Sequence, residues 1–403
     1  MIIKLKKYLV GGAVRDILLN IPVKEKDWLI IGVTPQYLLS KGYYQVGKDF
    51  PVFIHPNSKE EYALARKEKK TGFGHKGFNC YTSPLITVEE DLFRRDLTIN
   101  AMAIDKYGNI IDPYNGRKDI ELRILRHVSE SFRDDPLRVL RVARFAARFA
   151  HLGFTIAPET LNIMKQMKKE LFMLSPERIW KETVLALSTK NPHIFFIILK
   201  KCKALNIIFP EIYNLFGKKI FLKCKNFINA GDHALLALSN SVKISNNINV
   251  RFVTLCFNLP LLNNSLIKGK ETDIIYLMHK RLRLPNKLFN LLKIINDCYN
   301  TLININNLNI NNILNMFNRI GIKDCTDRIN QIILISKANY SVCVKFKNYM
   351  WNICDLVLDA YHIVKNLKAN VVMKDGFTGK NINYELTKRR LLLLNKWKIN
   401  LQN

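Results

Sequence analysis

The chain has 403 residues, of which 63 are Lys or Arg and 33 are Asp or Glu, so its formal net charge at pH 7 is +30. Because 48% of the residues are hydrophobic and 10% aromatic, the chain can bury a core, which excludes a disordered basic tail. Its length exceeds that of most single domains, so we expect two or more units. A folded, strongly cationic chain indicates a polyanionic partner, either a nucleic acid or an acidic membrane surface.

The positive charge is concentrated in the second half of the chain. Residues 1–180 carry 30 basic and 21 acidic side chains, a net of +9, whereas residues 181–403 carry 33 and 12, a net of +21. The alternative explanation of this charge is a general bias of the composition toward Lys and Asn, which would serve solubility and not the binding of a partner.

Several features bear on where the protein works. A membrane partner is not expected, since no apolar run approaches the ~18 to 20 residues that a membrane span requires. The first residues do not resemble a signal peptide, because Arg15 and Asp16 interrupt the apolar stretch. The eight cysteines form no CxxC pair, which indicates free thiols and a cytoplasmic location.

The hydrophobic pattern changes near residue 134. Before it, short apolar runs alternate with turn signals, which predicts strands and a few helices. After it, helical periodicity dominates, and we predict helices over 136–150, 176–187, 192–205 and 285–299. The fold expected is therefore an α/β domain followed by an all-α remainder.

Two motifs near the N-terminus have groups suited to nucleotide chemistry. GGAVRD at 11–16 ends an apolar strand and begins a helix, so its backbone N–H groups and Arg15 can approach a phosphate. Glu25 and Asp27 share a face if both lie on the strand that follows, and such neighbouring carboxylates suit Mg²⁺. The structural alternatives are a plain Gly-Gly turn and a solvated charged turn.

Residues 134–148 predict a helix with one basic face. Asp134 or Asp135 can cap it, and Pro136 suits its first turn. At 100° per residue, four arginines fall within a stripe about 120° wide: Arg138, Arg141, Arg144 and Arg148. Very few acidic residues stand four positions from them, which favours contacts with phosphate or base over salt bridges.

In their order and spacing, these motifs resemble those of the class II tRNA nucleotidyltransferases, the CCA-adding enzymes of the polymerase β superfamily. The matching segments are GGAVRD at 11–16, ExD at 25–27, RRDLTINA at 94–101, DPYNG at 112–116, DDPLRVLRVARF at 134–145 and SPERIWKE at 175–182. The resemblance implies an α/β nucleotidyltransferase head of the polymerase β type over residues 1–133. It also implies an all-α neck for nucleotide selection over 134–205 and an all-α, tRNA-binding body and tail over 206–403.

The resemblance further implies an activity and the residues that perform it. The RNA 3′-hydroxyl would attack the α-phosphate of CTP or ATP, adding CCA to tRNA without a nucleic-acid template. Glu25 and Asp27 would be the catalytic ligands of Mg²⁺. Nucleotide contacts are expected at Gly12, Arg15, Arg95, Asp135, Arg138, Arg141 and Arg144. The protein would act as a cytoplasmic monomer or dimer.

Within that implied site, Asp135 and Arg138 would read the incoming base. A carboxylate only accepts hydrogen bonds and a guanidinium only donates them. Cytosine and adenine each offer an amino donor beside a ring-nitrogen acceptor, whereas uracil and guanine offer the opposite arrangement. The pair therefore matches the two bases of a CCA end.

The chain departs from the family pattern in three places. Glu25 stands where the family usually has Asp, and Asp134 where it usually has Glu. Many relatives also carry an HD-type phosphohydrolase domain, but Phe257-Asn258 stand where its His-Asp doublet is expected, and only His233 is retained. We therefore expect that phosphohydrolase activity is lost.

A GxGxxG match at 72–77 lacks the preceding strand and following helix of a Rossmann site, so we predict a loop there. Two alternatives to CCA addition stay open at this point. One is a bacterial poly(A) polymerase, which shares GGxVRD and RRD. The other is a catalytically decayed RNA-binding protein.

Overall fold

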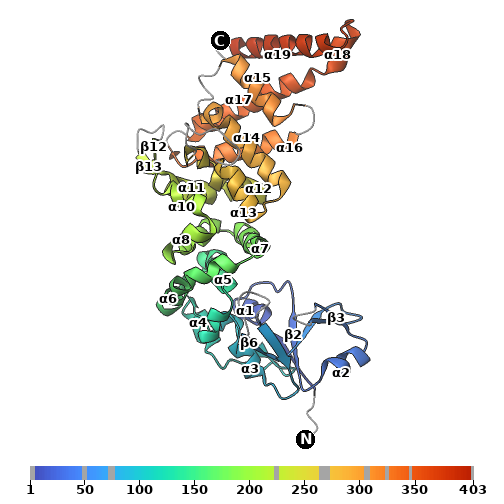
Figure 1. Cartoon of the computed structure of the whole chain (residues 1–403), viewed down its shortest axis with the longest axis vertical. Coiled ribbons are helices and arrows are strands. Elements are labelled where there is room, and N and C mark those ends of the chain that lie inside the picture. The colour runs from blue at the N-terminus through green and yellow to red at the C-terminus, as the bar shows by residue number, and fades with distance from the viewer. Residues whose placement is uncertain are drawn as a thin grey trace. The chain divides into compact units, whose positions relative to one another are not determined.

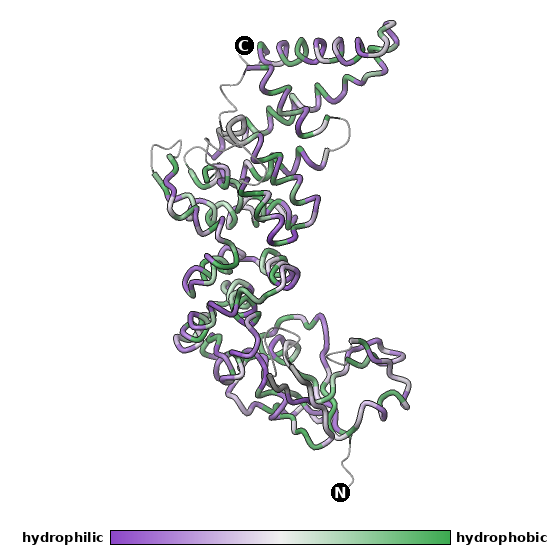
Figure 2. The backbone as a smooth tube through the Cα atoms, viewed as in Figure 1, coloured by the Kyte–Doolittle hydropathy of each residue, from purple (hydrophilic) through white to green (hydrophobic). Residues whose placement is uncertain are grey.

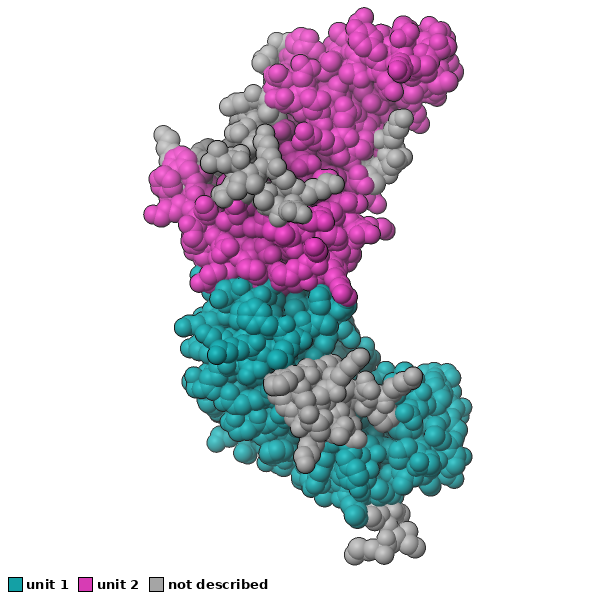
Figure 3. All heavy atoms as spheres, in the orientation of Figure 1, with its two compact units in different colours: residues 1–208 teal, residues 209–403 magenta. Residues whose placement is uncertain are grey.

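The computed structural model describes residues 5–47, 52–70, 78–221, 227–262, 273–303, 309–322, 326–344 and 347–400. The chain forms two compact units, residues 1–208 and residues 209–403, coloured teal and magenta in Figure 3. The first unit contains a mixed β-sheet with helices, and the second is mostly helical, which confirms the predicted fold class. The division of the first unit into head and neck stays a prediction.

Seven strands form the main sheet of the first unit (Figure 1). They are β1 (Lys6–Val10), β2 (Asp27–Ile31), β3 (Tyr44–Val46), β4 (Val52–Ile54), β5 (Glu61–Leu64), β8 (Ala103–Ile104) and β9 (Ile110–Ile111). Their order is β3-β4-β5-β2-β1-β8-β9, and β2 runs antiparallel to β1 but parallel to β5. The register places Asp27 beside Glu61, so these carboxylates start from adjacent positions on one face of the sheet.

Helices occupy most of the rest of the first unit. They are α1 (Gly12–Leu18), α2 (Pro35–Ser40), α3 (Val88–Phe93), α4 (Gly116–Glu121), α5 (Leu137–Phe149), α6 (Pro158–Gln166), α7 (Pro176–Leu187), α8 (Pro192–Lys201) and α9 (Leu205–Ile208). Short 3-10 turns are η1 (Thr98–Asn100), η2 (Glu130–Asp134), η3 (Ala150–Leu152) and η4 (Met167–Met173). Outside the main sheet, β6 (Arg66–Lys70) pairs with β7 (Phe78–Thr82), and β10 (Ile124–Leu125) pairs with β11 (Thr155–Ile156).

The second unit consists mainly of amphipathic helices. They are α10 (Pro210–Leu215), α11 (Ala230–Ser241), α12 (Ile248–Cys256), α13 (Ile274–Leu282), α14 (Asn286–Ile303), α15 (Ile310–Ile320), α16 (Thr326–Tyr340), α17 (Lys347–Asn366), α18 (Ala369–Lys374) and α19 (Lys380–Asn400), with the 3-10 turn η5 (Leu259–Leu262). Polar and apolar residues alternate along them in Figure 2, as helices with one buried face require.

Small strand pairs interrupt the expected all-helical remainder. β12 (Lys219–Phe221) and β13 (Phe227–Asn229) form an antiparallel pair, in which Phe221 lies opposite Phe227. The two rings contact each other, with centroids 5.0 Å apart. These segments are too short for a helix, and cross-strand aromatic contact stabilises the pairing instead.

The predicted helices match the observed ones to different degrees. α7 has the bounds predicted for it, and α5 is one residue shorter than predicted at each end. The helix predicted over 192–205 ends at Lys201, because Lys203 adopts a left-handed backbone with a φ of 59°. The last predicted helix starts one residue later and extends four residues further, as α14.

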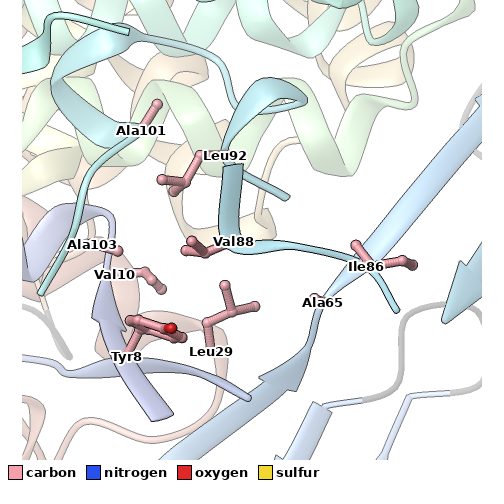
Figure 4. Close-up of a cluster of buried hydrophobic side chains, with 9 residues drawn as sticks. All are labelled: Tyr8, Val10, Leu29, Ala65, Ile86, Val88, Leu92, Ala101 and Ala103. Carbon is pink, nitrogen blue, oxygen red and sulfur yellow. The ribbon is translucent and has the colours of Figure 1, made fainter. Parts of the chain in front are cut away.

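A compact apolar cluster supports the strands that carry the carboxylates (Figure 4). Its buried members are Tyr8, Val10, Leu29, Ala65, Ile86, Val88, Leu92, Ala101 and Ala103. Leu29 belongs to this cluster and lies two positions after Asp27 on the same strand. Because alternate residues of a strand share a face, the cluster anchors the face on which Asp27 lies.

The turn between β1 and α1 depends on a glycine. Gly11 has a φ of +71°, which L side chains rarely adopt. A Cβ atom at this position would lie 2.6 Å from Nη1 of Arg95. The missing side chain therefore allows both the backbone turn and the approach of a guanidinium to it.

We expect Gly11→Ala to destabilise the protein more than Gly108→Ala. Gly108 also has a positive φ, but a Cβ there would meet no atom within 4 Å, so its substitution adds only backbone strain of roughly 1–2 kcal/mol. Gly11→Ala adds the displacement of Arg95 to a larger backbone strain, because a φ of 71° with a ψ of −125° lies outside the left-handed helical region. Urea unfolding of both variants measures the difference, and equal losses would contradict the role given to Arg95.

Candidate functional site

The predicted nucleotide-binding residues line one cleft in the first unit, with a volume of about 620 Å³. The cleft walls come from the β1–α1 turn, β2, β5, the segment 94–100, α5 with the residues before it, and α7. The predicted residues in the walls are Gly12, Arg15, Asp27, Arg95, Asp135, Arg138, Arg141 and Arg144. Segments more than 100 residues apart in sequence therefore meet around one space.

The carboxylates differ in how the fold positions them. Asp27 is the first residue of β2, whereas Glu25 precedes the strand, so the prediction that both lie on that strand was wrong for Glu25. Strand pairing stops at the Asp27–Val10 pair, which leaves Glu25 in an exposed connection.

The surroundings of Asp27 suit a cation. Partial burial raises the pKa of Asp27, the positive charge of Arg95 opposes this rise, and the negative charge of Glu25 adds to it. Glu61 also lines the cleft, directly beside Asp27 in the strand register. The neighbouring carboxylates Asp27 and Glu25 suit a hard divalent ion such as Mg²⁺, which would relieve the repulsion between them.

Sequence reasoning missed Glu61. The available signal was an acidic residue at the start of the short alternating segment EYAL at 61–64, which forms β5. Only the parallel pairing of β5 with β2 shows that Glu61 neighbours Asp27. The sequence of neither segment predicts which strand it pairs with.

Arg15 links the glycine turn to the segment after α3. Its side chain is 3% exposed, and its Nη1 donates to Oδ1 of Asn100 at 2.5 Å. Its Nε and Nη2 donate to Oδ1 of Asp16, at 2.9 and 2.8 Å. The other oxygen of Asp16 accepts from Nη2 of Arg148 at 2.9 Å. Arg15 therefore supports the cleft wall as well as lining it.

Asp96 joins this segment to α5. Its Oδ1 accepts from the backbone N–H of Leu97 at 2.9 Å and from Nδ2 of Asn100 at 3.0 Å, while its Oδ2 accepts from Nε of Arg141 at 2.8 Å. Burial alone would raise the pKa of Asp96, but the charge of Arg141 and these hydrogen bonds hold it well below its usual range. Asp96 is therefore a buried, ionised carboxylate with satisfied oxygens.

The arginine stripe of α5 is paired with carboxylates from other parts of the chain. Oε2 of Glu182 on α7 accepts from Nε of Arg144 at 2.6 Å, and Oε1 lies 4.0 Å from Nη1 of Arg141. The inference that a scarcity of acids at helical spacing disfavours salt bridges was therefore wrong. The partners come from segments that the fold brings to this helix, and the arginines still line the cleft.

The two predicted base-reading residues are both hydrogen-bonded. Arg138 is 9% exposed, and its Nη1 and Nη2 donate to the backbone carbonyls of Ser131 at 2.7 Å and Arg94 at 2.5 Å. Oδ1 of Asp135 accepts from the backbone N–H of Leu137, the first residue of α5, at 3.0 Å.

The other oxygen of Asp135 receives a partner that sequence reasoning did not single out. Nη2 of Arg178, on α7, donates to Oδ2 of Asp135 at 2.8 Å. Arg178 also lines the cleft. The segment SPERIWKE at 175–182 contains Arg178 and matches the family, but no role was predicted for this arginine.

In the second unit, His233 and Asn258 form a buried pair. Nδ2 of Asn258 donates to Nδ1 of His233 at 3.0 Å, and the histidine ring also hydrogen-bonds with the backbone of Asn339. Burial lowers the pKa of His233 to about 4, so the ring is neutral near pH 7. Within the described ranges, no three His, Cys, Asp or Glu side chains are grouped to hold a metal ion.

Other predictions concern thiols, membranes and the glycine-rich segment. The five cysteines whose side chains the structure describes are free and buried: Cys202, Cys256, Cys298, Cys343 and Cys354. Among the helices that the structure describes, none is long and apolar enough to cross a bilayer. The GxGxxG segment at 72–77 lies outside the described residues, but β6 ends just before it, so the expectation that no strand precedes it was wrong; a strand, β7, and not a helix follows it.

Comparison with known proteins places these features in a family. Residues 7–126 match the model of the poly A polymerase head domain, and residues 153–215 match a probable RNA- and SrmB-binding site of polymerase A. The CCA-adding enzyme of Blochmanniella pennsylvanica is 49% identical over 409 residues, covering 98% of this chain and 99% of the relative. That of Blochmanniella floridana is 49% identical over 406 residues, covering 98% of each chain.

The chain belongs to the family of CCA-adding enzymes. Solved structures of the family share its fold at lower identity. A Thermotoga maritima CCA-adding enzyme complexed with tRNA-CCA has a TM-score of 0.65 at 20% identity, covering 98% of this chain and 92% of that one. A Bacillus stearothermophilus CCA-adding enzyme in complex with CTP has a TM-score of 0.61 at 21% identity, covering 97% and 89%.

Within this family fold, we expect Asp96→Asn to destabilise the protein by about 3 kcal/mol, because it leaves Arg141 without its buried counter-charge. Since the folded pKa of Asp96 is lowered, its contribution is present above pH ~4 and is lost as the pH falls further. Urea unfolding measures the loss. The control is Glu130→Gln at the exposed Arg133–Glu130 pair, where we expect a change within about 0.5 kcal/mol. Similar effects of both substitutions would contradict this account.

His233 should make stability depend on pH in the range where an ordinary histidine titrates. In the unfolded chain the ring of His233 binds a proton near pH 6.5, but in the folded chain it does so only near pH 4. Stability from the neutral ring is therefore complete above pH 6.5 and declines by roughly 3 kcal/mol as the pH falls to 4. Urea unfolding from pH 4.5 to 7 should show a shallower slope for His233→Gln, whereas a variant of the exposed His151, H151Q, keeps the original slope. An unchanged slope for His233→Gln would contradict the assignment.

Proposed function

We propose that this protein adds CCA to tRNA 3′ ends from CTP and ATP, without a nucleic-acid template. The observation that carries the proposal is the single cleft shared by Asp27, the glycine turn and the Asp135–Arg138 segment. Family membership supports it, since the relatives at 49% identity are named CCA-adding enzymes.

Glu25 and Asp27 would hold Mg²⁺. Bound Mg²⁺ would supply Lewis-acid activation of the phosphate and of the attacking hydroxyl. The raised pKa of Asp27 fits a group arranged for a positive partner. Glu25 has one methylene more than the usual Asp, and it stands before the strand in an exposed position.

The incoming nucleotide would lie between the glycine turn and α5. The backbone N–H of Gly12 and the guanidinium of Arg95 would bind the triphosphate, since both residues line the cleft. Asp135 and Arg138 would read the base. Arg138 would then give up one of its hydrogen bonds to a backbone carbonyl and donate instead to the ring nitrogen of the incoming base.

We propose that tRNA is held mainly by residues 181–403, whose net charge is +21. A strongly cationic surface suits the phosphate backbone. The protein would act in the cytoplasm, as a monomer or dimer. The His233–Asn258 pair is proposed to stabilise the helical body in place of phosphohydrolase chemistry, because an amide nitrogen facing the ring is a donor and not a metal ligand.

A poly(A) polymerase is the second candidate, since the family model that matches residues 7–126 is described by that activity. The two activities differ in their products. A CCA-adding enzyme incorporates CMP twice before AMP, whereas a poly(A) polymerase adds a run of AMP.

The test uses the purified chain, Mg²⁺, labelled CTP and ATP, and a tRNA transcript that lacks CCA. We expect products that end in CCA, and loss of nearly all incorporation in Asp27→Ala and Glu25→Ala. Glu130→Gln, an exposed substitution outside the cleft wall, serves as the control with unchanged products. A run of A without C would favour the polymerase. No incorporation by the wild type would favour a decayed RNA-binding protein, and near-normal activity of Asp27→Ala would refute the metal assignment.

A further inference from the structure

The start of α7 fixes the place of Arg178. Oγ of Ser175 accepts from the backbone N–H of Arg178 at 3.4 Å, and Pro176 follows the cap as the first helical residue. Both features end the preceding segment and begin the helix at this point. Arg178 therefore stands in the first turn of α7, with a side chain 23% exposed at the cleft wall.

α7 presents opposite charges to α5 and the residues before it. Arg178 and Glu182 are one turn apart, so they share a face of α7. Arg178 pairs with Asp135, and Glu182 pairs with Arg144. On α7 the cation of one pair is Arg178 and the anion of the other is Glu182. These two ion pairs of opposite sense fix how α7 is aligned against α5 and the residues before it.

The carboxylate of Asp135 is held from two directions. Leu137 donates to Oδ1 from the backbone, and Arg178 donates to Oδ2 from another helix. Two donors on different oxygens fix the rotation of the carboxylate plane. A carboxylate has about four acceptor sites, so one can still receive an amino group from a base.

We infer that Arg178 determines base specificity by positioning Asp135. It orients the carboxylate so that an acceptor site faces the amino group of cytosine or adenine. Arg178 acts through Asp135 and does not contact the reacting atoms. The inference rests on the proposed function, because it requires that Asp135 reads the base.

The expected effect is a loss of discrimination. Arg178→Ala should lower the preference for CTP over UTP, measured as the ratio of kcat/KM values, by roughly tenfold. Arg178→Lys retains one charged donor without the guanidinium geometry, so an intermediate ratio is expected. Arg133→Ala is the matched control, since Arg133 is also an ion-paired arginine, with Glu130 at 2.7 Å, and should leave the ratio unchanged. Urea unfolding of each variant establishes that it is folded in the assay.

A double substitution separates positioning from a direct contact. If Arg178 acts through Asp135, Arg178→Ala should not lower the CTP preference further when Asp135 is already Ala. Two results would overturn the inference and leave the proposed base reading intact. One is an equal loss of CTP preference from Arg178→Ala in both backgrounds. The other is a wild-type preference in folded Arg178→Ala together with a reduced preference in Asp135→Ala. An unchanged preference in Asp135→Ala would overturn the proposed base reading and the inference with it.

Discussion

The buried carboxylate of Asp96 is the interaction on which the cleft depends. It lies away from water yet stays ionised, because Arg141, Asn100 and the backbone of Leu97 satisfy its oxygens. Through Arg141 it holds α5, and through Asn100 it connects to Arg15 beside the glycine turn. The carboxylate therefore joins the sheet side of the cleft to its helical side.

The same principle explains why the cleft contains so many arginines without collapsing by repulsion. Buried or half-buried guanidinium groups need nearby carboxylates, and here Asp16, Asp96 and Glu182 supply them. Each of these acids fixes an arginine that also faces the cleft. Substrate phosphates would therefore meet a positive surface that is already ordered, which reduces the cost of organising it during binding.

Local patterns predicted much of this structure. Helical periodicity predicted the bounds of α7 and the course of α5. The residues around the cleft were found because they lie in short motifs. The partners were not found, since Glu182 lies 38 residues from Arg144 and Arg148 lies 132 residues from Asp16. Glu61 was missed for the same reason, because strand register is a long-range property.

A double-mutant cycle between Asp96 and Arg141 tests the central claim most directly. The free energy of unfolding is measured for the wild type, Asp96→Asn, Arg141→Gln and the double variant. If the pair joins the two sides of the cleft, the losses will be coupled by more than about 1 kcal/mol, because removing one partner takes from the other its nearest opposite charge. Losses that add within about 0.4 kcal/mol would contradict the account.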